Sequence, residues 1–222
     1  MLRQLPRWAW FGGGLLAFIA GMINAVGFMG FRHQAITHLT GTTTLLGTAL
    51  AEANVGEALH WVLAIVSFVG GAVLSGFIVQ QHTLKLGRRY GVALMVESLL
   101  LFAAVPLIHN GNDGGLYLAS IACGLQNAMA STYSGATFRT THLSGMFTDL
   151  GIYIGQRLRG LAVDALRIQV CVVVTGGFLA GATAGSLIFR VLQERTLLIP
   201  AVLTGASGLI YAIYRHRQVG MH

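Results

Sequence analysis

Two segments of this chain bring a histidine, several hydroxyl residues and two glycines together in the same order. They read THLTGTTTLLG at 37–47 and THLSGMFTDLG at 141–151. Hydroxyl groups and the N-termini of short helices can donate hydrogen bonds to an anion or a polar solute, and freed backbone carbonyls can hold a cation. The duplication therefore predicts a shared binding site. The alternative is that the hydroxyls only bond to backbone carbonyls within helices.

The candidate binding residues are the polar residues and glycines of these two segments, together with amides in the apolar stretches before them. Gly41 and Gly145 would let the backbone turn or approach a ligand closely. Carboxamides inside a membrane either bind a solute or hold helices together, and both readings stay open. The predicted substrate-binding residues are Asn24, His38, Thr40, Gly41, Thr42, Gln126, Asn127, His142, Ser144, Gly145 and Thr148.

The matched histidines, His38 and His142, are the titratable pair of the two segments. An imidazole, with an unperturbed pKa near ~6.5, can gate a pathway or relay protons. The alternative is that each is a hydrogen-bonded packing residue. No third nitrogen, sulfur or carboxylate ligand stands at a metal-site spacing from them, so we expect neither a metal ion nor another cofactor.

Two carboxyl groups are candidates for ion or proton coupling. Asp149 follows His142 by seven residues, so both would share a face if the segment is helical. Glu97 lies inside the apolar stretch 90–108. A carboxylate at membrane depth is costly and indicates function by default. The alternatives are an interhelical hydrogen bond or protonated packing for Glu97, and for Asp149 a salt bridge to Arg139, Arg157 or Arg159.

The composition is that of a membrane protein. Hydrophobic residues make up 55% and charged residues 9% of the chain, and the mean hydropathy is +0.70. A soluble domain carries about 25% charged residues. The net charge of +7 does not indicate nucleic-acid binding, because the basic residues are scattered over short loops. Stretches of about 20 apolar residues, enough to span a ~30 Å core, lie at 8–31, 58–81, 90–108, 114–134, 168–189 and 196–214. Cys123 and Cys171 fall inside these stretches and are interpreted as small core residues.

The basic residues favour six membrane spans over eight. The polar segments 37–51 and 140–154 would be helices of about 22 Å, too short and too polar to cross comfortably. With six spans and a cytoplasmic N-terminus, 11 of the 14 basic residues are cytoplasmic, as the positive-inside rule requires. With eight spans the tally is 7 against 7, because four basic residues change sides: Lys85, Arg88, Arg89 and Arg139. In the six-span arrangement the three outside are Arg32, Arg190 and Arg195.

Three spans per repeat is an odd number, so the second repeat must enter the membrane from the opposite side. We therefore expect one all-α membrane domain over 1–222. It would have six transmembrane helices plus two short re-entrant or broken polar helices, in inverted repeats at about 8–108 and 114–214. Non-helical backbone at that depth must be buried in protein or line water. The two polar segments should therefore face each other in the interior.

Several motifs resemble those of the YoaK family of bacterial multi-pass inner-membrane proteins, a domain of unknown function. They are GMINA at 21–25 with Phe28, HLTG at 38–41, CGLQNA at 123–128, RTTHLSG at 139–145 and TDLG at 148–151. The resemblance covers 20–190 and implies a multi-pass protein of the bacterial inner membrane, without a substrate. The chain has Asn24 where the family usually has Asp, and Thr42 where it usually has Asn. If that Asp couples ions in relatives, Asp149 would have to serve here, or coupling is absent.

We therefore expect a small permease, a transporter or channel, for a small polar or anionic solute held near the membrane midplane. Both termini would be cytoplasmic, and the partners would be the lipid bilayer, the solute and further copies of the chain. A non-transporting scaffold is the alternative. An enzyme using His142 and Asp149 is less favoured, because no nucleophile or third ligand accompanies them. No G-x-x-x-x-G-K-[ST] loop is present, so ATP-driven transport by this chain alone is not expected.

Overall fold

The chain is all-helical wherever its structure is described. The computed structural model describes residues 7–30, 35–79, 89–133 and 139–219, and no strand occurs in these ranges. Each predicted apolar stretch and each polar segment coincides with a helix, which confirms the all-α class. The helices are α1 (Arg7–Gly30), α2 (Leu39–Ala51), α3 (Val55–Ile78), α4 (Arg89–His109), α5 (Gly114–Tyr133), α6 (Leu143–Leu158), α7 (Ala165–Leu192), the short 3-10 helix η1 (Gln193–Leu197) and α8 (Leu198–Val219).

Four stretches of the described chain are long and apolar enough to cross a membrane. They are Ala9–Gly30, Val55–Ile78, Arg89–His109 and the 49-residue stretch Ala165–Ile213, which contains α7 and most of α8. Large apolar side chains such as Phe77 and Leu179 are exposed on the outer faces of these helices, as contact with lipid requires. α5 is not among these stretches, since it carries Ser120, Gln126 and Asn127. The protein is a membrane protein, while the number of spans stays a prediction.

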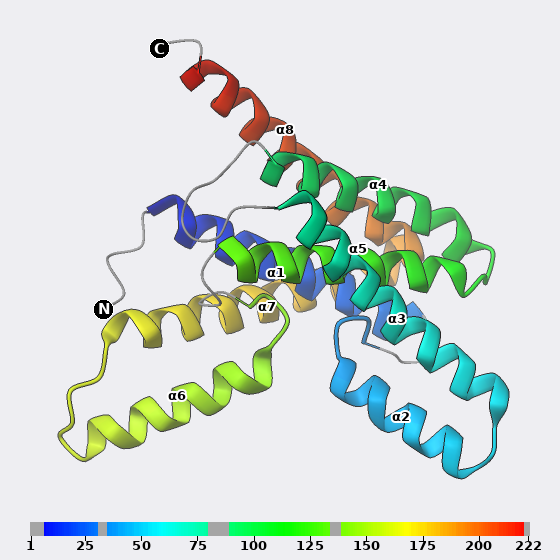
Figure 1. The fold of residues 1–222 in the computed structure, drawn as a ribbon, viewed down its shortest axis with the longest axis horizontal. Coiled ribbons are helices and arrows are strands. Elements are labelled where there is room, and N and C mark those ends of the chain that lie inside the picture. Colours follow the sequence, from blue (N-terminus) through cyan, green and yellow to red (C-terminus); the bar gives the residue numbers. More distant parts are fainter. Residues whose placement is uncertain (1–6, 31–34, 80–88, 134–138, 220–222) are drawn as a thin grey trace.

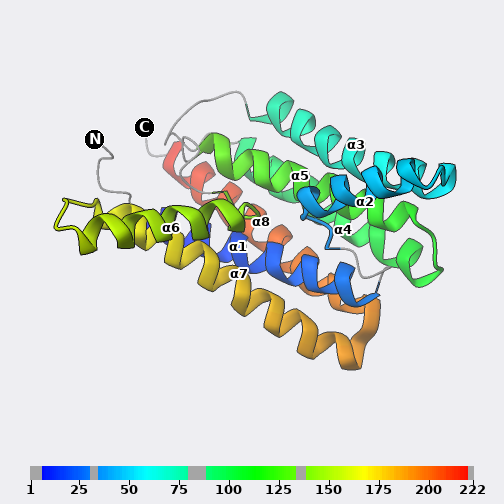
Figure 2. The same ribbon diagram turned by 90° about the horizontal axis from the view of Figure 1, so that it is seen from below.

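The long helices form two pairs, α1 with α7 and α3 with α5, and the two members of each pair come from different halves of the chain. The most extensive contacts join α1 to α7 and α3 to α5, and α4 packs against α5 and α8. Figures 1 and 2 show α1 and α7 side by side, running in the same direction, with α5 and α8 running back. The first long helix of each predicted repeat therefore packs against the third helix of the other.

Glycines let the paired backbones approach closely. A Cβ atom at Gly21 of α1 would collide with the carbonyl oxygen of Phe178 on α7, and one at Gly181 of α7 would collide with that of Phe18 on α1. Both glycines belong to motifs that occur twice in the chain. These are Gly-x-x-Asn-Ala, at 21–25 and 124–128, and Phe-x-x-Gly-Ala, at 68–72 and 178–182. The same arrangement joins α3 to α5, at Gly124 against Phe68 and at Gly71 against Ile121. The duplicated glycines are therefore explained by helix packing.

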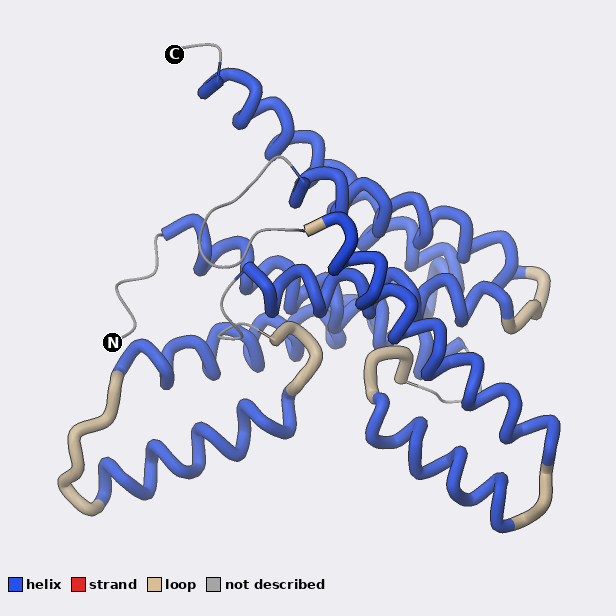
Figure 3. The backbone as a smooth tube through the Cα atoms, in the orientation of Figure 1, coloured by secondary structure: helices blue, strands red, loops and turns tan. Residues whose placement is uncertain are grey.

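A buried apolar cluster fills the space between these pairs. It draws Ile19 and Ile23 from α1, Leu101 from α4, Leu116 from α5 and Leu197 from η1, all fully or almost fully buried. Short loops, tan in Figure 3, join α2 to α3 and α6 to α7, so each short helix folds back on the long helix that follows it. Four of the basic residues used to infer topology lie outside the described residues: Arg3, Arg32, Lys85 and Arg88.

Candidate functional site

The two polar segments form short helices attached to the same side of the molecule. α2 has 13 residues and α6 has 16. In both views their N-terminal ends lie toward the middle and their C-terminal ends point to opposite ends of the molecule (Figures 1 and 2). α2 packs against α3 and α6 against α7, and the described parts of α2 and α6 do not contact each other.

The matched histidines occupy the same position in both copies. His38 is the N-cap of α2, with φ −93° and ψ 67°, and His142 is the N-cap of α6, with φ −94° and ψ 59°. Neither side chain caps its helix by a hydrogen bond. Each imidazole instead lies over the glycine three residues later, where a Cβ at Gly41 or Gly145 would collide with the ring. The glycines are needed here for side-chain clearance, and the two rings are exposed.

Most of the hydroxyl groups bond to their own helix. The Thr42 and Thr148 hydroxyls donate to the carbonyl oxygens of His38 and Ser144, at 3.2 and 2.9 Å. Thr44 does the same to Thr40. This pattern is expected of hydroxyls that only bond to backbone carbonyls of their own helix, and it favours the scaffold alternative for these residues. The side chains of Thr40 and Ser144, in the first turns of α2 and α6, are exposed, so this face is open rather than enclosed.

Asn24 fixes the start of α2. Its Oδ1 accepts hydrogen bonds from the backbone N–H of Thr37 at 2.9 Å and from the Thr37 hydroxyl at 3.1 Å. The carboxamide of α1 therefore anchors the residue just before the His38 N-cap. Its repeat counterpart differs: Asn127 Oδ1 is buried and has no hydrogen-bond partner among the residues that the structure describes, and the same holds for the hydroxyl of Thr140. The structure thus assigns a positioning role to Asn24, where the sequence left binding and helix contact equally open.

Gln126 and Glu97 lie inside the bundle, in helices other than α2 and α6. Gln126 of α5 is fully buried and donates its side-chain N–H to the carbonyl oxygen of Leu16 on α1, at 3.1 Å. Glu97 of α4 is also fully buried. Gln126 therefore holds two helices together, whichever further role it has.

Asp149 is an exposed residue of α6, the short helix that packs against α7. Arg167 of α7 lies close enough to Tyr153 and Asp149 to interact with both. The partners of Asp149 suggested by the sequence are Arg139, Arg157 and Arg159, and Arg167 is not among them. α6 begins at Leu143 and His142 is its N-cap with non-helical backbone angles, so a shared helix face for His142 and Asp149 stays a prediction.

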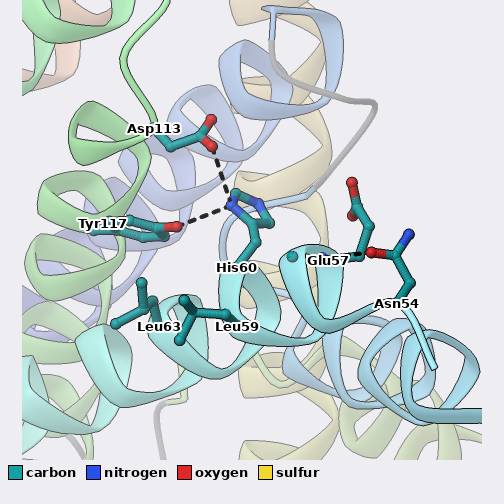
Figure 4. Close-up of a pocket in the computed structure, with 8 residues that line it drawn as sticks. Asn54, Glu57, Leu59, His60, Leu63, Asp113 and Tyr117 are labelled. Atoms are coloured by element: carbon teal, nitrogen blue, oxygen red, sulfur yellow. Dashed lines mark hydrogen bonds and ion pairs between the residues drawn. The ribbon is translucent and has the colours of Figure 1, made fainter.

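A polar groove lies where the N-terminal ends of α3 and α5 meet, and the sequence did not indicate it. His60 is buried, and its Nδ1 lies 2.9 Å from the Tyr117 hydroxyl and 3.4 Å from Asp113 Oδ2 (Figure 4). Asn54 and Glu57 complete the polar lining. The cluster ties α3 to the start of α5. Its only sequence signal was a histidine beside a tryptophan in an apolar stretch, which is also how a packed core histidine appears.

Residues 13–210 match the family described as "Protein of unknown function (DUF1275)". The chain is also similar to the UPF0700 transmembrane protein YoaK of Bacillus subtilis (strain 168), with 26% identity over 149 residues. That stretch is 65% of this chain and 66% of the relative. No solved structure matches. The resemblance inferred from the motifs is thereby confirmed, and the chain belongs to the DUF1275 family that is represented by YoaK.

Proposed function

We propose that the protein is a small permease, a transporter or channel, for a small polar or anionic solute. The site lies at the N-terminal ends of α2 and α6, near the membrane midplane. The observation that carries the proposal is the placement of these two short helices, whose N-terminal ends turn toward the middle of the molecule (Figure 1). The first N–H groups of a helix have no intrahelical partner, so these ends offer donors and a positive dipole to an anion.

The opposite directions of α2 and α6 support inverted repeats. In the six-span arrangement one short helix enters from outside and its counterpart from the cytoplasm, which also gives the 11 to 3 distribution of basic residues. The exchange of partners, α1 with α7 and α5 with α3, is the contact pattern expected of two intertwined repeats. The cytoplasmic termini and the inner membrane belong to the same proposal.

Non-helical backbone before α2 and α6 adds a physical reason for a solute pathway. Such backbone is tolerated at membrane depth only where protein covers it or water reaches it. Thr40 and Ser144 are exposed at this place, so water at their position would hydrate the helix ends. An open, hydrated surface with hydroxyls, imidazoles and the first N–H groups of two helices suits a small anion or polar solute.

The test is solute flux into liposomes that contain the purified protein, with small inorganic anions, carboxylates and neutral polyols as solutes. We expect Thr40→Val and Ser144→Ala to slow the transported solute about tenfold each, the effect of losing one hydrogen bond to a charged group. The control is Thr183→Val in α7, since Thr183 is also exposed and lies outside both short helices, where its hydroxyl donates to the carbonyl oxygen of Leu179. Flux should be unchanged in this variant.

The scaffold alternative predicts a different result from the same variants. Because Thr42, Thr44 and Thr148 bond to their own helices, the alternative has direct support. Under it, Thr40→Val and Ser144→Ala weaken folding together without altering solute flux, which for the wild type and both variants stays at the level of empty liposomes. That outcome would refute the permease and establish the scaffold.

A further inference from the structure

Glu97 is a fully buried carboxyl group near the middle of an apolar helix. Its exposed fraction is 0%, and neither carboxylate oxygen has a hydrogen-bond partner among the described residues. The neighbouring Ser98 hydroxyl does not donate to Glu97, because it donates to the carbonyl oxygen of Ala201 on α8, at 2.7 Å. An acidic group with two unpartnered oxygens at this depth is the least satisfied polar side chain of α4 and calls for a ligand.

The register of α4 and α5 brings Glu97 level with the amide-rich part of α5. Gly115 packs against Ala104 and Ile108, which fixes the level at one end of this antiparallel pair. The level of Gly115 therefore corresponds to position 106 of α4, midway between Ala104 and Ile108. Counting nine residues from there, about 13.5 Å at 1.5 Å per residue, leads to Gly124 on α5 and to Glu97 on α4. The electrostatic interaction of Glu97 with Cys123 agrees with this register.

Gln126 presents an acceptor at the same level. Its side-chain N–H donates to Leu16, which fixes the orientation of the carboxamide. Its Oε1 is buried and has no partner among the described residues. Gln126 and Glu97 therefore bring three unpartnered oxygens within about one helical turn of a common level, on adjacent helices.

The number of oxygens favours a proton over a metal cation. Mg²⁺ and Ca²⁺ require about six or more oxygen ligands, whereas a proton on Glu97 requires one acceptor, which Gln126 can supply. We propose that Glu97 and Gln126 form a proton-binding site between α4 and α5, separate from the α2 and α6 ends, and that it binds the proton coupled to transport. The coupling role rests on the proposed function, whereas proton binding does not.

One other titratable side chain interacts with Glu97, and the remaining ones around α4 lie further along the helices. Cys123 is the titratable side chain of α5 that interacts with Glu97. Tyr211 of α8 interacts with Tyr90, about two helical turns from Glu97. At the far end of α4, His109 pairs with Glu194 of η1 at 3.9 Å. The remaining described groups on the elements that pack against α4 are Glu57 and His60 of α3, Tyr117 of α5, Arg195 of η1 and, on α4 itself, Arg89.

Infrared spectroscopy of the full chain in lipid bilayers tests proton binding without any substrate. We expect a carbonyl-stretch band of a protonated carboxyl group that is absent in Glu97→Gln and that loses intensity as the pH is raised. Exchanging K⁺ for Na⁺ at constant pH should not change it. Gln126→Leu should shift the band, because it removes the acceptor. Glu52→Gln is the matched control, since Glu52 is exposed at the end of α2.

Three outcomes would overturn the proton site. A Glu97 band that persists at every pH means a permanently neutral packing group, no such band at acidic pH means a permanent carboxylate, and loss of the band with Na⁺ means a sodium site. Should Glu97→Gln not fold, Glu97→Asp, which keeps the carboxyl group, identifies the band by a shift. Coupling is tested separately: Glu97→Gln should exchange solute but not accumulate it in a pH gradient. A titrating band without any solute flux would refute the permease and leave the proton site in place.

Discussion

Two adjacent glycines of α3 allow the packing of α3 against α5 to be tested. A Cβ at Gly71 would lie 2.9 Å from the backbone nitrogen of Leu125 and closer still to the carbonyl oxygen of Ile121, whereas a Cβ at Gly70 would meet nothing within 4 Å. We expect Gly71→Ala to destabilise the protein relative to Gly70→Ala. The comparison is matched, because both changes remove a glycine from the interior of the same helix.

The magnitude follows from two contributions. Replacing a helical glycine with alanine stabilises by about 0.5–1 kcal/mol, and this contribution is common to both variants. Forcing a methyl group into close-packed atoms costs about 1–3 kcal/mol, and this applies to Gly71→Ala alone. The free energies of unfolding should therefore differ by about 1–3 kcal/mol, with Gly70→Ala at or above the wild type. In lipid, close packing is a main source of helix association, so little else compensates.

The assay is reversible unfolding of both variants in mixed micelles, followed by circular dichroism. The second half of the chain already contains a natural counterpart of the control, since alanine stands at 180 where the first half has Gly70, while Gly181 is retained. Equal unfolding free energies for the two variants would refute the close approach of α3 and α5, and with it the explanation given for the duplicated glycines.

Two further predictions concern the start of α2 and the topology. Asn24→Ala should lower the free energy of unfolding by about 1–3 kcal/mol, because the buried N–H of Thr37 loses its acceptor. Asn24→Asp keeps an acceptor and should unfold like the wild type. An equal loss of unfolding free energy in the two variants would refute the anchoring role. In a chain lacking both native cysteines, single cysteines at Asn54 and Asn112 should label from outside intact cells and one at Leu161 only from inside. If Asn54 and Asn112 label with Leu161, the short helices cross the membrane and six spans are wrong.

The helices themselves could be predicted from the sequence, because each feature that determines them is local. Runs of apolar residues set the positions of the long helices, and the two polar segments were recognised as helices too short to cross a membrane. The duplication also identified His38 and His142 as equivalent residues, and their matching N-cap geometry agrees with that.

The partners of the polar side chains could not be predicted, because they depend on how distant helices pack. Nothing near Gln126 in the sequence indicates Leu16, which lies 110 residues away. The same applies to His60 and Tyr117, which are 57 residues apart. Arg167 reaches Asp149 only because α6 folds back along α7. In each case the pattern identified a polar group that needs a partner, and tertiary structure selected which one.

The exposure of the hydroxyls was the expectation that the structure changed most. The polar segments were expected to face each other in the interior, yet α2 and α6 do not touch, and Thr40 and Ser144 are exposed. Each short helix packs against one long neighbour, whereas the α1–α7 and α3–α5 pairs are held together by close contacts at glycines. The start of α2 is held by the hydrogen bonds between Asn24 and Thr37, and the Asn127 carboxamide shows no such bond for α6 among the described residues. The proposed solute site thus lies at two exposed helix ends, whereas the proposed proton site at Glu97 lies in the buried interior of the bundle.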